Sequence, residues 1–244
     1  MDPATRRPVQ GSAKLVMDSY AEYALEVAIQ LKEKHPASQV VPLCVGDKPA
    51  DDVLRRAYAL TADEAVRVWD PAWADLDSQA VAHILARTIQ KLGGADLVLT
   101  GREAGDIERG VVGPTLAEEL GYACATIVAR VEAVEGKSAV VRREVDGGYA
   151  LVSTRLPAVL TITNDETNVP RLPKVKDLMM AARKPITVLG AADLDLDPAR
   201  LASPLELVDL YIPVQEGQCE IIEGDDGPAK AAALARRLHE LKLV

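Results

Sequence analysis

Apolar runs of strand length alternate with amphipathic helical patterns along the N-terminal part of this chain. Strand-like runs occupy residues 39–46, 65–69 and 95–100, and apolar residues recur at helical spacing in residues 20–34, 49–60 and 77–93. Asp18 or Ser19 is available as the N-cap of the first helix, and Asp77 or Ser78 as that of the third. Nearly continuous apolar strands between helices are typical of a parallel sheet with helices on both faces. The sequence therefore predicts an α/β fold with a mostly parallel sheet.

The pattern changes after Gly121 to four strand-like runs separated by short turns. These runs lie at residues 125–134, 138–146, 149–157 and 158–163. Asp146-Gly147-Gly148 stands between two alternating runs and is typical of a hairpin turn. We therefore expect an antiparallel edge on the parallel sheet. Beyond it, residues 163–185 are irregular with one short helical stretch, and the tail ends in a pattern that suits a surface helix.

The composition excludes several classes of protein. The formal net charge of −9 disfavours a nucleic-acid binder. No apolar run reaches the roughly 18–20 residues that a membrane span needs, and the N-terminus lacks the apolar core of a signal peptide. We therefore expect a soluble cytoplasmic protein without membrane insertion. The three cysteines and three histidines are scattered, which predicts neither a disulfide scaffold nor a metal site.

No bond-making catalytic residue is predicted either. The sequence does not place a nucleophile beside a base. His83 falls on an apolar helical face, and Cys44 and Cys124 fall in apolar strand-like runs, where core or boundary positions are the common case.

The glycine-rich loop after the run at 95–100 is the strongest candidate for a binding site. It leaves a strand at its carboxyl end, where ligands of open α/β sheets bind. It leads into a helix with Pro114 in its first turn, and the backbone N–H groups of such a helix start can hold a phosphate. The loop has neither the GxGxxG fingerprint nor a Walker A motif. The residues alone favour phosphate binding and a plain helix start about equally.

Four segments in order resemble the beta subunit of electron transfer flavoprotein. They are MDSYAEYALEVAIQLKEK, VVGPTLAEELG, RREVDGGYALVSTRLPAVLTIT and NVPRLPKVKDLMMAARKPI, which begin at residues 17, 111, 142 and 168. The ordered agreement of four spaced segments makes the likeness specific. It implies an adenine-nucleotide-binding, Rossmann-like domain over residues 1–190. Residues 191–244 would form an extended C-terminal arm and a helix that packs on a partner subunit.

The resemblance also implies a function. A beta subunit of this family pairs with an alpha subunit, and the two share a redox FAD that lies mainly on the alpha subunit. The complex carries electrons from flavin dehydrogenases, such as acyl-CoA dehydrogenases, to a membrane quinone reductase. The beta subunit holds AMP in its loop, or a second FAD in electron-bifurcating members that oxidise NADH. A different possibility is a stand-alone adenine-nucleotide sensor of the universal-stress-protein type, which would need no partner and show no flavin.

The family's nucleotide-binding positions can be carried over to this chain. The resemblance places the loop ligand against Asp18, Ser19, Tyr20, Ala21, Val45, Asp106, Arg109, Gly110, Val111, Val112, Gly113 and Thr115. Many members have Asp-x-Asp-Thr-x-Gln where this chain has the residues from Asp106 to Val111. Arg109 could pair with a phosphate or be a solvated surface charge. This change leaves AMP and a second FAD as alternatives.

A second departure concerns the start of the chain. Family members usually begin with an apolar strand that becomes a central strand of the sheet, whereas this chain opens with MDPATRRP. Without that strand, the neighbouring strands would have exposed edges with unpaired backbone groups.

The segment 166–184 corresponds to the family's partner-recognition loop. Val175 falls at the position of its apolar anchor, with Leu172, Leu178 and Met179 nearby and basic residues on either side. An apolar anchor with a polar rim suits a brief protein encounter. From the residues alone, a short amphipathic helix folded on its own sheet is the simpler interpretation; the resemblance favours docking.

Overall fold

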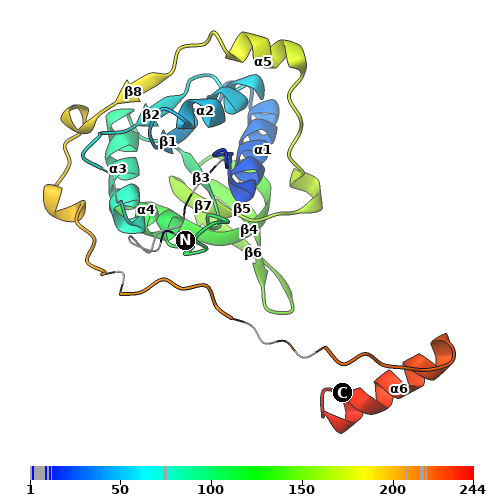
Figure 1. The fold of residues 1–244 in the computed structure, drawn as a ribbon. Coiled ribbons are helices and arrows are strands. Elements are labelled where there is room, and N and C mark those ends of the chain that lie inside the picture. The colour runs from blue at the N-terminus through cyan, green and yellow to red at the C-terminus, as the bar shows by residue number, and fades with distance from the viewer. Residues whose placement is uncertain are drawn as a thin grey trace. The chain divides into compact units, whose positions relative to one another are not determined.

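The computed structural model describes residues 2, 9, 11, 13–73, 76–206, 208–214, 217 and 219–244. The chain divides into two compact units, a larger one formed by residues 10–206 and a smaller one formed by residues 1–9 and 207–244. Most of the MDPATRRP segment lies outside the described residues. Figure 1 shows the elements of both units.

Two sheets form the centre of the larger unit. The first is parallel, in the order β1-β2-β8, with β1 Leu43–Val45, β2 Val66–Val68 and β8 Thr187–Leu189. The second has the order β3-β7-β4-β5-β6, with β3 Leu97–Gly101, β4 Ala123–Glu135, β5 Ser138–Val145, β6 Gly148–Arg155 and β7 Ala158–Ile162. Strands β3, β7 and β4 pair in parallel, whereas β4, β5 and β6 pair antiparallel. The predicted α/β fold with an antiparallel edge is confirmed.

The division into two sheets is the main departure from the predicted arrangement. Strands β1 and β3 are each the end strand of their sheet. All their residues are only half-buried, whereas β2 and β7 are buried throughout. The two runs have the apolar composition of central strands, yet each pairs on one side only among the described strands. Each of the two strands therefore leaves one edge unpaired among the described strands.

The helices follow from the predicted patterns and caps. The larger unit contains α1 Ser19–Lys34, α2 Ala50–Ala59, α3 Ser78–Lys91, α4 Val112–Leu120 and α5 Val175–Ala181, with 3-10 turns η1 Glu166–Asn168, η2 Ala191–Asp193 and η3 Pro198–Arg200. Asp18 caps α1 and Asp77 caps α3, each with a side-chain oxygen that accepts from backbone N–H groups. Such caps supply partners for amides that the helix itself leaves unpaired.

Alternate side chains of the edge strands show that helices cover both faces. In β3, Leu97 and Leu99 pack against α1, whereas Val98 packs against α3 and α4. In β1, Cys44 packs toward α2, whereas Leu43 packs toward α3. Because successive strand residues point to opposite faces, α1 and α2 lie on one side and α3 and α4 on the other.

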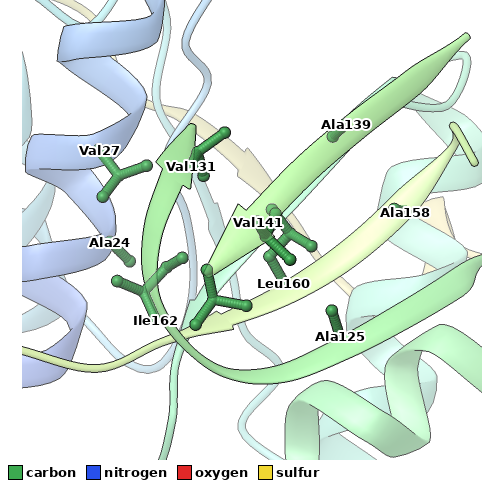
Figure 2. Close-up of a cluster of buried hydrophobic side chains, with 10 residues drawn as sticks. Ala24, Val27, Ala125, Val131, Ala139, Val141, Ala158, Leu160 and Ile162 are labelled. Carbon is green, nitrogen blue, oxygen red and sulfur yellow. The ribbon is translucent and has the colours of Figure 1, made fainter. Parts of the chain in front are cut away.

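Figure 2 shows the core cluster between α1 and the five-stranded sheet. Ala24 and Val27 of α1 meet strand residues such as Val141, Leu160 and Ile162, all buried. The chain has no Phe, so small and branched aliphatic side chains fill this core. Full burial of each Val, Leu or Ile contributes about 1.5–3 kcal/mol. The buried residues of this cluster are therefore all aliphatic.

The hairpin between β5 and β6 has the predicted turn. The strands end at Val145 and resume at Gly148, and Gly147 has a φ of 79°. That left-handed conformation is open to glycine at no steric cost. The Asp-Gly pair thus fixes the register of the edge strands.

The segment after β8 belongs to the larger unit. Leu194 is buried against the three-stranded sheet, with Leu196 and Leu201 packed beside it. Residues 191–206 therefore lie within the larger unit, while the sequence analysis begins the arm at residue 191. The smaller unit contains α6, Gly227–Glu240, which is capped by Asp226 and has no buried residue. No helix among the described residues has the length and apolarity needed to cross a membrane.

Candidate nucleotide and docking sites

Asp18 joins the first turn of α1 to the glycine-rich loop between β3 and α4. One carboxylate oxygen accepts hydrogen bonds from the backbone N–H groups of Tyr20, at 2.9 Å, and Ala21, at 3.4 Å. The other accepts from the N–H of Gly105, at 2.7 Å. Ser19 is the first residue of the same helix. The structure therefore brings the predicted residues 18–21 and the loop together.

Gly101 allows α1 to lie against the start of the loop. A Cβ atom at Gly101 would stand 2.8 Å from the Cβ of Tyr20 and 3.1 Å from the backbone nitrogen of Ala21. The guanidinium carbon of Arg102 lies 5.1 Å from the centre of the Tyr20 ring, a cation–π distance. A side chain at Gly101 would collide with the Cβ of Tyr20 and crowd the backbone of α1, so glycine lets the loop leave β3 close to the helix.

Helix α4 begins without a side-chain cap. Val111 is its N-cap and makes no capping hydrogen bond, and the first bond of the helix runs from the N–H of Thr115 to the carbonyl of Val111, at 3.0 Å. The N–H groups of Val112 and Gly113 precede that bond and have no intrahelical acceptor. Uncapped amides and the helix dipole favour an anion at this end. The first amides of α1 donate to the Asp18 carboxylate, whereas no side chain caps the first amides of α4, which could therefore donate to a phosphate.

Gly113 is required by packing beneath the helix. It is buried, and a Cβ atom there would stand 2.4 Å from Cγ2 of Thr161 and 2.8 Å from Oγ1 of Thr100. The glycine therefore lets the first turn of α4 rest directly on β3 and β7. Gly113, one of the predicted nucleotide-binding positions, therefore also has a packing role against two strands.

Thr100 and Thr161 are site residues that the sequence analysis did not select. Thr161 is 2% exposed, and its hydroxyl accepts the N–H of Ile127 at 2.9 Å, where β4 bulges and Ile127 has a φ of 55°. In the sequence, each of these threonines is a polar residue near the end of an apolar strand-like run, which is the pattern that could have indicated them. The first turn of α4 packs against these two threonines at Gly113.

The other predicted nucleotide-binding residues are dispersed around the loop. Asp106 is exposed, and Gly110 turns the chain with a φ of 62°. Val45 ends β1 in the three-stranded sheet, where it packs with Val66 and Val68. The structure thus places Val45 at the carboxyl end of a strand, but in the sheet that does not contain the loop.

Arg109 acts electrostatically on Asp77, the N-cap of α3. Burial raises the pKa of the Asp77 carboxyl, but hydrogen bonds, including one from the N–H of Ala80, and the charge of Arg109 outweigh it. The pKa of Asp77 therefore lies below its ordinary value. The charge of Arg109 makes the smallest of these contributions.

The docking segment, residues 166–184, presents its apolar side chains outward. The exposed fractions are 81% for Leu172, 74% for Val175, 44% for Leu178 and 65% for Met179. In α5 only Ala181 is buried, against a cluster that includes α2 residues. The basic residues Lys174, Lys176, Arg183 and Lys184 flank this surface. The four apolar residues are therefore exposed and not buried on the chain's own sheet, as the simpler interpretation of the segment would require.

Metal ligation has no candidate site in the part of the chain that the structure describes. No group of three or more His, Cys, Asp or Glu side chains lies together there. His83 is buried and its Nδ1 lies 3.2 Å from a carboxylate oxygen of Glu119, while its Nε2 accepts the N–H of Asp197 at 3.4 Å. It links α3, α4 and the segment before η3.

Comparison with known proteins agrees with this architecture. The family model described as the electron transfer flavoprotein domain matches residues 9–194. The electron transfer flavoprotein subunit beta of Thermoanaerobacterium thermosaccharolyticum is 34% identical over 92% of this chain and 86% of its own length. The caffeyl-CoA reductase-Etf complex subunit CarD of Acetobacterium woodii is 31% identical over 100% of this chain and 94% of its own. Protein FixA of Azorhizobium caulinodans is 33% identical over 80% of this chain and 71% of its own.

The layered α/β fold, with parallel strands between helices on both faces, is of the Rossmann-like class. The chain belongs to the electron transfer flavoprotein family. Several of its relatives are named as beta subunits of that family, and the predicted resemblance is confirmed.

Proposed function

We propose that this chain is the beta subunit of a heterodimeric electron transfer flavoprotein. It would pair with an alpha subunit, share an FAD with it, and carry electrons from flavin dehydrogenases, such as acyl-CoA dehydrogenases, to a membrane quinone reductase. The observation that carries the proposal is the family match over residues 9–194. FAD would supply the redox chemistry, and the protein would supply position and electrostatics.

The loop at α4 is the proposed site for AMP. The N–H groups of Val112 and Gly113 would face its phosphate, since α4 has no cap of its own. Asp18 would hold the loop in place through Gly105. The residues present fit a phosphate on the geometry of these amides. A second FAD of a bifurcating protein would offer the same loop a diphosphate, so the loop chemistry is common to both ligands.

The docking segment is the proposed contact with the dehydrogenase. Val175 and its neighbours form an exposed apolar surface with basic residues around it. Apolar anchors surrounded by charge combine fast encounter with rapid release. This combination suits a carrier that must leave its donor after each transfer.

One experiment tests the assignment as a whole. We would co-express the chain with an alpha subunit from the same source, purify the complex, denature it and quantify the released nucleotides by chromatography. One FAD and one AMP per heterodimer is the expected result. Two FAD without AMP would transfer the proposal to the bifurcating form, and a chain that binds AMP alone, without partner or flavin, would reject it in favour of a nucleotide sensor.

A further inference from the structure

Glu26 of α1 is a buried carboxylate that the nucleotide site does not use. Its residue is 4% exposed, yet its two oxygens accept several hydrogen bonds. Arg171 donates from Nε at 2.9 Å, from Nη2 at 2.8 Å and from its backbone nitrogen at 3.3 Å, and Gln30 donates from Nε2 at 3.0 Å. A buried carboxylate is costly unless it is paired in this way. Its position therefore calls for a structural or functional reason.

The same neighbourhood fixes the main chain just before the docking surface. Gln30 Nε2 also donates to the carbonyl of Thr167 at 2.9 Å. The side-chain amide of Asn168, which is 2% exposed, donates to the carbonyl of Ala129 in β4 at 2.5 Å. Side chains thus bind residues 167–171 to both α1 and the five-stranded sheet.

The far end of the docking segment is held independently by α2. Arg55 Nη1 donates to the carbonyls of Ala181 at 3.1 Å and Ala182 at 2.7 Å, and the hydroxyl of Tyr58 donates to the carbonyl of Pro185 at 2.7 Å. Figure 1 shows α5 beside α2. Between the two anchored ends lie the exposed apolar residues.

We propose that Glu26 and Arg171 are positioning residues for the docking segment, which they hold in its docking conformation before a partner dehydrogenase arrives. This inference rests on the proposed function of that segment. An interaction surface that is ordered in advance binds more tightly, because less conformational freedom is lost on association. The pairing is bidentate, which fixes orientation as well as distance.

Glu33 is a second carboxylate partner of Arg171, and it can be compared with Glu26. Arg171 also pairs with this glutamate, at 2.5 Å between Nη1 and Oε1, but the Glu33 side chain is 57% exposed. Exposed ion pairs contribute little because water competes for both charges. We therefore expect Glu26, and not Glu33, to be the effective partner of Arg171.

The first test measures amide hydrogen exchange in the purified heterodimer. The variants are Arg171→Gln, Arg171→Lys, Glu26→Gln and Glu33→Gln, with exposed Arg155→Gln in β6 as the matched control. We expect exchange in residues 167–180 to rise by about tenfold or more in Arg171→Gln and Glu26→Gln, and to stay near wild type in Glu33→Gln and the control. Arg171→Lys should recover part of the protection, since it keeps the charge but loses the planar fork.

The second test separates positioning from general stability. The probe is an acyl-CoA dehydrogenase reduced by its acyl-CoA substrate, with each heterodimer as electron acceptor. Arg171→Gln should raise the KM for the heterodimer several-fold, while kcat and bound FAD remain at wild-type levels. Wild-type exchange and KM would overturn the proposal, and so would increased exchange throughout the sheets together with loss of FAD.

A failure of the underlying docking function would look different. Val175→Ala changes the exposed anchor and leaves the Glu26–Arg171 pair intact. If Val175→Ala left KM unchanged, the docking assignment would fail. If Val175→Ala raised KM but Arg171→Gln did not, despite faster exchange in residues 167–180, docking would stand and positioning by Arg171 would be rejected.

Discussion

The candidate nucleotide loop and the candidate docking segment are both held by side-chain contacts, but they expose different groups. The loop is held at Gly105 by Asp18 and at the start of α4 by the close contact of Gly113 with two strands, and it offers backbone amides. The docking segment is fixed only toward its ends, by Arg171 and Arg55, and offers side chains in between. A resident ligand needs a rigid cradle, whereas a visiting partner needs an accessible surface. The predictions below test this contrast, from the largest expected effect on stability to the smallest.

Substitution Gly113→Ala should give the largest loss of stability. Its new Cβ atom would stand 2.4 Å from Thr161, so α4 or β7 must shift. Overpacking of this kind costs about 1–3 kcal/mol, and each kcal/mol lowers the Tm by roughly 2–4 °C at this chain length. Thermal unfolding of the heterodimer measures the change. Gly227→Ala is the control, since a Cβ there would meet nothing within 4 Å; an unchanged Tm for Gly113→Ala would contradict the packing role.

Substitution Asp18→Ala should cost about 0.5–2 kcal/mol through the lost helix cap. It should also release the loop at Gly105, which lowers the content of bound AMP. The matched control is Asp226→Ala, because Asp226 caps α6 through the N–H of Ala229 at 2.8 Å. Chromatography of released AMP and thermal unfolding provide the two measurements. If Asp18→Ala and Asp226→Ala lowered the AMP content equally, the contact of Asp18 with Gly105 would have no specific effect on AMP, and Asp18 would act only as a helix cap.

Acid should loosen the docking segment as the pH falls through the lowered pKa of Glu26. Burial raises the pKa of Glu26, but hydrogen bonds from Arg171 and Gln30 outweigh it, so the pKa lies below the ordinary value of 4.5. For a lowered carboxyl pKa, the stabilisation is present above the ordinary value and is lost as pH falls through the value in the folded protein. Exchange in residues 167–180, corrected for its intrinsic pH dependence, measures this loss. Glu26→Gln should abolish the acid step; a step that persists in that variant must come from another group.

Substitution Val175→Ala should change stability least. Its side chain is 74% exposed, and substitutions of this kind usually fall within about 0.5 kcal/mol of wild type. Electron transfer from a dehydrogenase should slow, while Tm, FAD and AMP remain unchanged. Loss of flavin in this variant would assign Val175 a structural role and remove the contrast between the two regions.

Local patterns predicted the elements well because their causes are local. Asp18 and Asp77 cap the helices for which they were candidates, and the hairpin turns at Asp146-Gly147. The division into two sheets could not be predicted from such patterns, since periodicity does not specify which strands pair.

The site was predicted less completely for the same reason. The contact of Gly113 with Thr161 and the pairing of Glu26 with Arg171, 145 positions apart, exist only in the folded chain. The resemblance supplied the proposed ligand-binding and docking positions, whereas the structure shows which contacts hold those segments in place.

Helix α3 packs against both sheets, and α1 packs against the five-stranded sheet and against α2 beside the other sheet. In α1, Ala24 and Val27 belong to the core of the five-stranded sheet, whereas Leu25 and Ile29 belong to a cluster beneath α2. In α3, Ile84 packs on the three-stranded sheet, and its neighbours on the helix pack near β3. Among the described strands, no ladder joins the two sheets. Their cooperativity in unfolding therefore depends on side-chain contacts rather than on strand pairing, and we expect each sheet to open as a separate unit of hydrogen exchange.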